Sequence, residues 1–126
     1  MFDPDKYLSV TWQKGGRLYP KLDCFGIVNE IRGDLGLPKF PDFAGVTKDD
    51  GGLNREALAY MPNLTPCEPH PGALAMCYTG SMVTHVAVVV RLNGELRAAE
   101  SNPKTNVTFL PLGRFLHKFV KVEFYQ

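Results

Sequence analysis

The sequence lacks the features that mark membrane, secreted and nucleic-acid-binding proteins. Its longest apolar run, Val86 to Val90, is far too short to span a bilayer. The N-terminus has no basic region followed by an apolar run, so we expect no signal peptide and synthesis in the cytoplasm. The formal net charge is only +1, which gives no electrostatic reason to expect nucleic acid or a membrane surface as a partner.

Cysteine is scarce as well, and repeats and low-complexity tracts are missing. Three cysteines cannot all pair within one chain, which favours a reducing compartment over a disulfide framework. A chain of 126 residues is long enough for one domain with its own core and too short for two. We therefore expect residues 1–126 to form a single domain.

A short amphipathic helix is predicted to begin at or just after Cys24. Apolar residues recur at spacings of three and four from Ile27 to Leu35, and Asp23 is a residue type that caps helix N-termini. In the first turn, free amides and the helix dipole favour an anion, so we expect a lowered thiol pKa and a nucleophilic thiolate. The alternative is a buried cysteine that starts an ordinary core helix.

The two halves of the chain differ in their periodicity. The first half is predicted to hold the Cys24 helix, a surface loop over 37–52 and a second helix over 53–61. In the second half we predict a series of short strands, at residues 73–78, 84–91, 95–100, 107–110 and 120–125. The predicted fold is therefore α+β, with N-terminal helices packed on an antiparallel sheet that runs as a meander.

A thiolate nucleophile needs a general base, and His85 is the best candidate among three histidines. His85 opens the most apolar strand, where its ring can be held rigidly at the sheet edge. His70 lies among prolines and His117 lies beside a lysine near the end of the chain, where we expect both to be solvated or in a loop. A histidine at a strand start can also be purely structural.

These residues resemble the motifs of the NlpC family of papain-like cell-wall cysteine peptidases. The segment Asp23-Cys24-Phe25-Gly26-Ile27-Val28 is similar to the family's D-C-x-G-L-V signature. Three other segments follow the family's order, resembling its P-G-D-L, H-V-G-I-Y and V-x-x-x-P-L-x-R-F stretches: 71–74, 85–89 and 107–115. Gly15-Gly16-Arg17 is similar to a G-G-R that precedes the cysteine in versions from phage tails.

The resemblance covers nearly the whole chain and implies a papain-like fold with Cys24 as nucleophile and His85 as base. It implies hydrolysis of amide bonds to γ-D-glutamyl or diamino-acid residues in peptidoglycan stem peptides, with no cofactor and no metal. The phage-type motif implies a tail-associated, wall-degrading protein that acts at the cell wall, with other tail proteins as partners.

The residue that orients the catalytic histidine departs from the family pattern. Its usual position, on the strand after the Asn93-Gly94 turn, falls close to Ala98, which cannot serve. Glu100 lies on the same strand face and could hold the second imidazole nitrogen, with Asn102 as a weaker candidate. Glu100 could equally be a solvated carboxylate at the end of a strand.

Residues around the thiol are expected to bind substrate. The family often has an aromatic residue upstream of the cysteine, and here Trp12 and Tyr19 are both candidates to line the cleft. Asp23 completes the predicted substrate-binding set. The backbone amide of Cys24, at the helix start, is the expected oxyanion donor.

Other functions remain open at this point. Four residues, Cys67, His70, Cys77 and His85, could in principle bind zinc, although the spacing of the last two fits no familiar zinc motif. The chain could be a structural or wall-binding tail module, because the usual third residue and the acid after Pro71-Gly72 are missing. An amidase injected into a competing bacterium is a third alternative.

Overall fold

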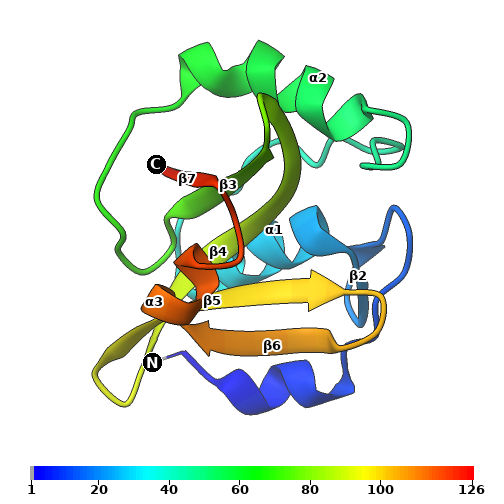
Figure 1. Cartoon of the computed structure of the whole chain (residues 1–126). Helices are drawn as coiled ribbons and strands as arrows, with labels where there is room; N and C mark the ends of the chain where they lie inside the picture. The colour runs from blue at the N-terminus through cyan, green and yellow to red at the C-terminus, as the bar shows by residue number, and fades with distance from the viewer. Residues whose placement is uncertain (1) are drawn as a thin grey trace.

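The computed structural model describes residues 2–126 and has an α+β fold (Figure 1). Its centre is a five-stranded antiparallel sheet with the strand order β6-β5-β4-β3-β7. The five strands are β3 (Leu74–Thr79), β4 (Met82–Leu92), β5 (Glu95–Asn102), β6 (Asn106–Pro111) and β7 (Lys121–Tyr125).

Two helices cover one face of this sheet. Helix α1 (Cys24–Asp34) packs on β4 and β5, and α2 (Gly52–Tyr60) packs on β4 and continues into the 3-10 turn η2 (Met61–Asn63). Apolar side chains of α1 are buried against alternate residues of β4, as their helical and strand periods require. Within residues 2–126 no helix has both the length and the apolar character to cross a membrane.

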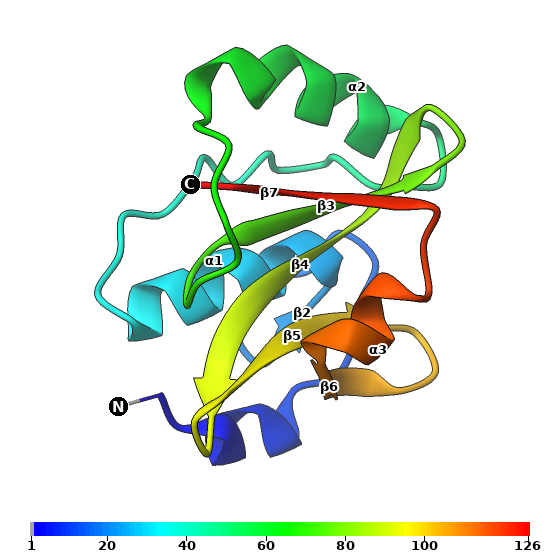
Figure 2. The same cartoon turned by 60° about the vertical axis from the view of Figure 1, so that its left-hand side comes forward.

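The opposite face of the sheet has a smaller core of its own. Phe115, from the short helix α3 (Leu112–Leu116), is fully buried there against small side chains: Ala75, Cys77, Ala87 and Ala98. Figure 2 shows α3 and α1 on different sides of the central strands. The residues of β4 from Val86 to Val90 are buried on both faces, as their unbroken apolar run predicts.

The meander that we predict holds for four strands and is wrong for the last one. After α3 the chain crosses back, and β7 pairs with β3 at the far edge, with Leu74 opposite Tyr125. A pattern of alternating residues predicts a strand, but it does not determine which neighbour the strand will pair with.

The segment before α1 is more ordered than a turn. A 3-10 helix, η1 (Pro4–Ser9), is followed by two short paired strands, β1 (Arg17–Leu18) and β2 (Lys21–Leu22).

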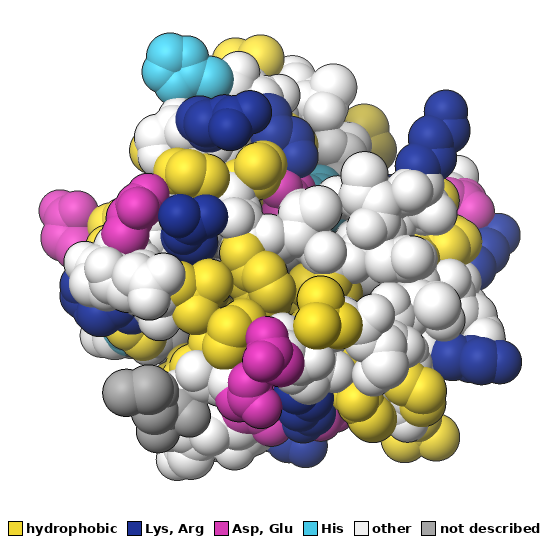
Figure 3. Space-filling model, turned by 90° about the horizontal axis from the view of Figure 1, so that it is seen from below, with side chains coloured by type: hydrophobic (Ala, Val, Ile, Leu, Met, Phe, Trp, Pro, Cys, Tyr) yellow, Lys and Arg dark blue, Asp and Glu magenta, His cyan; other side chains and the backbone are white. Residues whose placement is uncertain are grey.

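Figure 3 shows hydrophobic side chains gathered at the centre of the face seen from below. A hollow of about 510 Å³ between η1 and β6 is lined in part by Leu8, Val107 and Phe109.

Strands β4 and β5 separate at one end, and this opening positions the site. Their pairing runs from Leu92 opposite Glu95 to Val88 opposite Ala99 and ends there. Beyond that pair β4 stays paired with β3 and β5 with β6, but the two strands no longer pair with each other. Helix α1, which packs on both β4 and β5, begins at this opening. Ser101 of β5 donates a hydrogen bond to the Leu22 carbonyl (2.7 Å), which fixes the chain just before α1.

Candidate active site

Helix α1 begins at Cys24, as predicted, because Asp23 caps its N-terminus. Asp23 has extended backbone geometry, and its Oδ1 accepts hydrogen bonds from the amides of Phe25 (3.1 Å) and Gly26 (2.8 Å). These bonds satisfy two of the amides that have no partner within a helix. The cap places the cysteine in the first turn with its own N–H unused, since that amide has no acceptor within residues 2–126.

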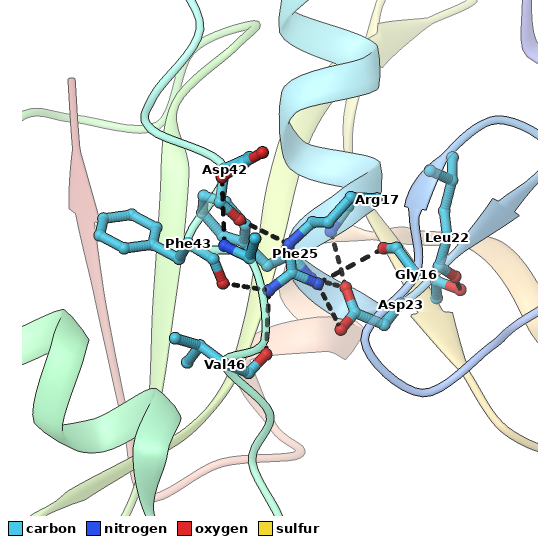
Figure 4. A network of polar contacts seen from close by, with 11 residues as sticks. Gly16, Arg17, Leu22, Asp23, Phe25, Asp42, Phe43 and Val46 are labelled. Carbon is cyan, nitrogen blue, oxygen red and sulfur yellow. Dashed lines mark hydrogen bonds and ion pairs between the residues drawn. The ribbon is translucent and has the colours of Figure 1, made fainter.

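Arg17 ties the same carboxylate to the loop that follows α1 (Figure 4). Its Nη1 donates to Asp23 Oδ2 at 2.7 Å, in an ion pair that is nearly buried. The other guanidinium nitrogens donate to backbone carbonyls of the loop, those of Asp42 (2.6 Å), Phe43 (3.3 Å) and Val46 (2.9 Å). One arginine therefore fixes the start of α1 and the loop beside it.

Two glycines allow the chain to pass close to the start of α1. A Cβ on Gly26 would collide with the carbonyl oxygen of Gly16, and a Cβ on Gly16 would lie 2.5 Å from the carbonyl oxygen of Lys21. Both positions therefore require glycine because backbone atoms fill the space a side chain would need. This contact gives a physical reason for glycine at position 26, after Asp23-Cys24, and at position 16, before Arg17.

The Cys24 sulfur lies inside the opening between β4 and β5. It accepts a hydrogen bond from the backbone N–H of Val86, and only 5% of the residue is exposed. Our expectation of a lowered thiol pKa is wrong for this structure. Burial, together with the charge of Asp23, raises the pKa of the Cys24 thiol to about 11, and the Val86 hydrogen bond offsets this only in part.

His85 and Glu100 form a buried pair across the same opening. The Nε2 atom of His85 lies 3.0 Å from Glu100 Oε1, so the hydrogen bond that we expect between them is present. Phe119 stacks on the imidazole with the ring centroids 5.8 Å apart. Glu100 is fully buried, which contradicts the alternative of a solvated strand-end carboxylate.

A third residue, Lys118, contacts this pair and was not predicted from the sequence. Its Nζ donates to both oxygens of Glu100, at 3.0 and 2.9 Å. Burial alone would raise the pKa of the Glu100 carboxyl, but the hydrogen bonds from His85 and Lys118 hold it below its ordinary value. Burial lowers the pKa of His85 in spite of the hydrogen bond to Glu100, so the imidazole is neutral near pH 7.

Cys24 and His85 approach this opening from different layers of the molecule. The cysteine belongs to the core under α1, and His85 pairs with Cys77, on the sheet face that carries Phe115. The sulfur contacts the backbone of Val86, which is the residue next to His85 in β4, so both side chains belong to residues at this opening. The Nδ1 atom of His85 has no hydrogen-bond partner among the described residues, so it is the imidazole nitrogen that remains free to accept a proton.

Separate hollows are lined by His85 and by Cys24. A wide hollow of about 680 Å³ is lined by His85, Glu100 and Lys118, and also by Lys48. Two narrow hollows of about 40 and 20 Å³ lie beside Cys24, one apolar under α2 and one next to Trp12, and Lys48 lines both. A ligand can therefore reach the neighbourhood of the base more easily than that of the thiol.

The predicted substrate-binding residues have different positions. Trp12 lines the narrow hollow with Cys24, as expected. Tyr19 lines none of these hollows: its hydroxyl contacts Ser9 Oγ (2.8 Å) and the Lys6 carbonyl (3.0 Å), which corrects its placement in the cleft. Asp23 lines the narrow hollows, but both of its carboxylate oxygens are already bonded within the chain.

The structure also distinguishes the other candidates for the residue that orients the His85 ring. Asn102 lines the wide hollow but makes no hydrogen bond to the His85 ring. Ala98 is fully buried in the small core with Phe115.

The four residues considered for zinc do not converge. No group of three or more His, Cys, Asp or Glu side chains within residues 2–126 is placed to hold a metal ion. The Nε2 of His70 contacts Gln126 Oε1 at 3.0 Å, whereas Cys77 is a buried cross-strand neighbour of His85. Burial raises the pKa of the Cys77 thiol, so it stays protonated beside the base.

Comparison with known proteins does not assign the chain to a family. No model of a known protein family matches the chain, and no curated protein matches it as a relative.

Proposed function

We propose that this protein is a papain-like cysteine peptidase that hydrolyses amide bonds to γ-D-glutamyl or diamino-acid residues in peptidoglycan stem peptides. One observation carries the proposal. The buried His85–Glu100 pair lies at the same strand opening as a thiol in the first turn of a helix. Nucleophile, base and orienting carboxylate are the parts that acyl transfer through a thioester requires.

The first step starts from a neutral thiol and a neutral imidazole, because burial raises the pKa of Cys24 and lowers that of His85. As the sulfur attacks the substrate carbonyl carbon, its proton moves to Nδ1 of His85. Glu100, bonded to Nε2, stabilises the imidazolium that forms. The oxyanion accepts a hydrogen bond from the free Cys24 amide at the start of α1.

The second step releases both products. The imidazolium gives its proton to the leaving amine as the C–N bond breaks, which leaves a thioester on Cys24. Water then attacks the thioester carbonyl while His85 accepts its proton, and the thiol recovers a proton as the carboxylic acid product leaves. Each proton that His85 accepts is returned within the same cycle.

A second candidate is a binding module with the same fold and little activity. The observation that favours it is the burial of Cys24, which is only 5% exposed and has a thiol pKa of about 11. A substrate must enter the narrow hollow beside Trp12 or displace the loop above it before the thiol can attack.

The test uses the wild-type protein and a panel of tri- and tetrapeptide muropeptides under reducing conditions. Mass spectrometry of the products identifies which amide bond is cleaved, and the same protein with its thiols alkylated is the control. We expect cleavage beside the γ-D-glutamyl or diamino-acid residue by the free protein alone. An intact panel would support the binding module instead.

A further inference from the structure

Among residues 2–126, Lys48 is the cation at this site that forms no ion pair. Arg17 is paired with Asp23, Lys118 with Glu100, and Lys14 with Asp49 (2.8 Å). Lys48 makes no ion pair or hydrogen bond with any residue from 2 to 126, although it is half-buried. A half-buried ammonium group that forms no ion pair is available to bind an anion.

The position of Lys48 links the nucleophile with the base. It lines the wide hollow together with His85, and it lines both narrow hollows together with Cys24. Its charge acts on both groups, since it contributes to a lower pKa of the Cys24 thiol and to a lower pKa of the His85 imidazole. An anion bound by Lys48 would therefore lie beside the bond that is attacked.

The substrate class of the proposed function supplies such an anion. A γ-glutamyl residue is linked to the next residue through its side-chain carbonyl, so its α-carboxylate stays free a few bonds away from the scissile carbonyl. We propose that Lys48 binds this α-carboxylate, so that the protein selects acidic γ-glutamyl peptides over peptides in which the same carboxylate is amidated. This inference rests on the proposed peptidase function.

A lysine side chain discriminates strongly between a carboxylate and the corresponding amide. An ammonium group donates charge-assisted hydrogen bonds to a carboxylate, and it gains much less from a neutral amide oxygen. Selection should therefore appear in kcat/KM as a preference of at least about tenfold for the acidic peptide.

The experiment measures kcat/KM for two synthetic peptides that differ at one group, a γ-D-glutamyl peptide with a free α-carboxylate and its α-amide. For wild type we expect the acid to be preferred by at least about tenfold. For Lys48→Met the ratio should fall to about one, and Lys48→Arg should keep most of it because the charge remains. Lys39→Met, which removes an exposed lysine that lines none of the three hollows, should keep the wild-type ratio.

Two results would overturn the inference while leaving the proposed function intact. One is wild-type cleavage of acid and amide at equal kcat/KM, and the other is a Lys48→Met variant that keeps the wild-type preference. If the wild-type protein cleaves neither peptide and leaves every muropeptide of the panel intact, the proposed function is contradicted, and this inference with it.

Discussion

Glu100 keeps its negative charge although none of its surface reaches water. Lys118 makes this possible because it supplies a counter-ion that contacts both carboxylate oxygens, at 3.0 and 2.9 Å. The same positive charge contributes to lowering the pKa of His85. The pair of charges thus holds the histidine in place and leaves it neutral, which is the form a general base needs.

The pH dependence of the reaction follows from these pKa directions. Because burial lowers the pKa of His85 below its ordinary 6.5, the imidazole becomes protonated and inactive only below that pH. Because the pKa of Cys24 is about 11, deprotonation of the thiol does not limit the rate at mildly alkaline pH. We expect kcat/KM to be level from about pH 7 to 9 and to fall below pH 6.5.

Lys118 variants give the matched comparison for this pH profile. Removing the lysine charge in Lys118→Met leaves Glu100 free to stabilise the imidazolium, so the acidic limb should move to higher pH. Lys118→Arg keeps the charge and should keep the limb near its wild-type position. A bell-shaped wild-type profile with a loss of activity above pH 8 would instead indicate a preformed thiolate–imidazolium pair.

At the scale of elements, the start of α1 depends on Asp23, which serves as helix cap and as ion-pair partner of Arg17 through different oxygens. Asp23→Ala removes both functions and leaves the Arg17 charge without its partner, so we expect a loss of about 3–5 kcal/mol in the free energy of unfolding. Asp23→Asn keeps an oxygen for the amides of Phe25 and Gly26 and should cost clearly less.

Urea unfolding of the two Asp23 variants and wild type measures these free energies. Equal losses for Asp23→Ala and Asp23→Asn would mean that the cap contributes nothing and that the charge alone matters. A loss below about 1 kcal/mol for Asp23→Ala would contradict the structural importance of both contacts.

The elements that the sequence predicts well are those defined by local patterns. The helix from Cys24, the Asn93-Gly94 hairpin and the strand through His85 have strong local signals, and all three are present. Lys118 had no such signal, because its contact with Glu100 depends on where α3 and β7 bring the chain back. Tyr19 is a candidate for the cleft because the resembled family often has an aromatic residue upstream of the cysteine, but the Tyr19 hydroxyl instead bonds near η1.

The burial of the site residues could not be predicted from local sequence patterns. A cysteine in a first helical turn is usually expected to ionise easily, but the layers around Cys24 exclude water and raise its pKa. Glu100 and Asn102 were both candidates until the register of β5 placed only the glutamate against the imidazole. Both outcomes depend on how the strands and helices pack, which spacing along the chain does not determine.

At the scale of the whole molecule, the site lies where two cores meet. The core under α1 supplies the thiol, the small core around Phe115 borders the histidine and glutamate, and the opening between β4 and β5 joins them. The same arrangement places Cys77, the cysteine nearest to the base in the sheet, with its thiol buried in the small core. Cys67 is partly exposed in the irregular segment before β3.

The three cysteines therefore allow the most direct test of the central claim, that Cys24 is the nucleophile. Cleavage of the γ-D-glutamyl muropeptide is measured for Cys24→Ala, Cys67→Ala and Cys77→Ala beside wild type, with circular dichroism to verify each fold. We predict that Cys24→Ala loses at least about a thousandfold in kcat with its fold intact, and that the other two variants stay active. Folded Cys24→Ala that cleaves at the wild-type rate would contradict the account.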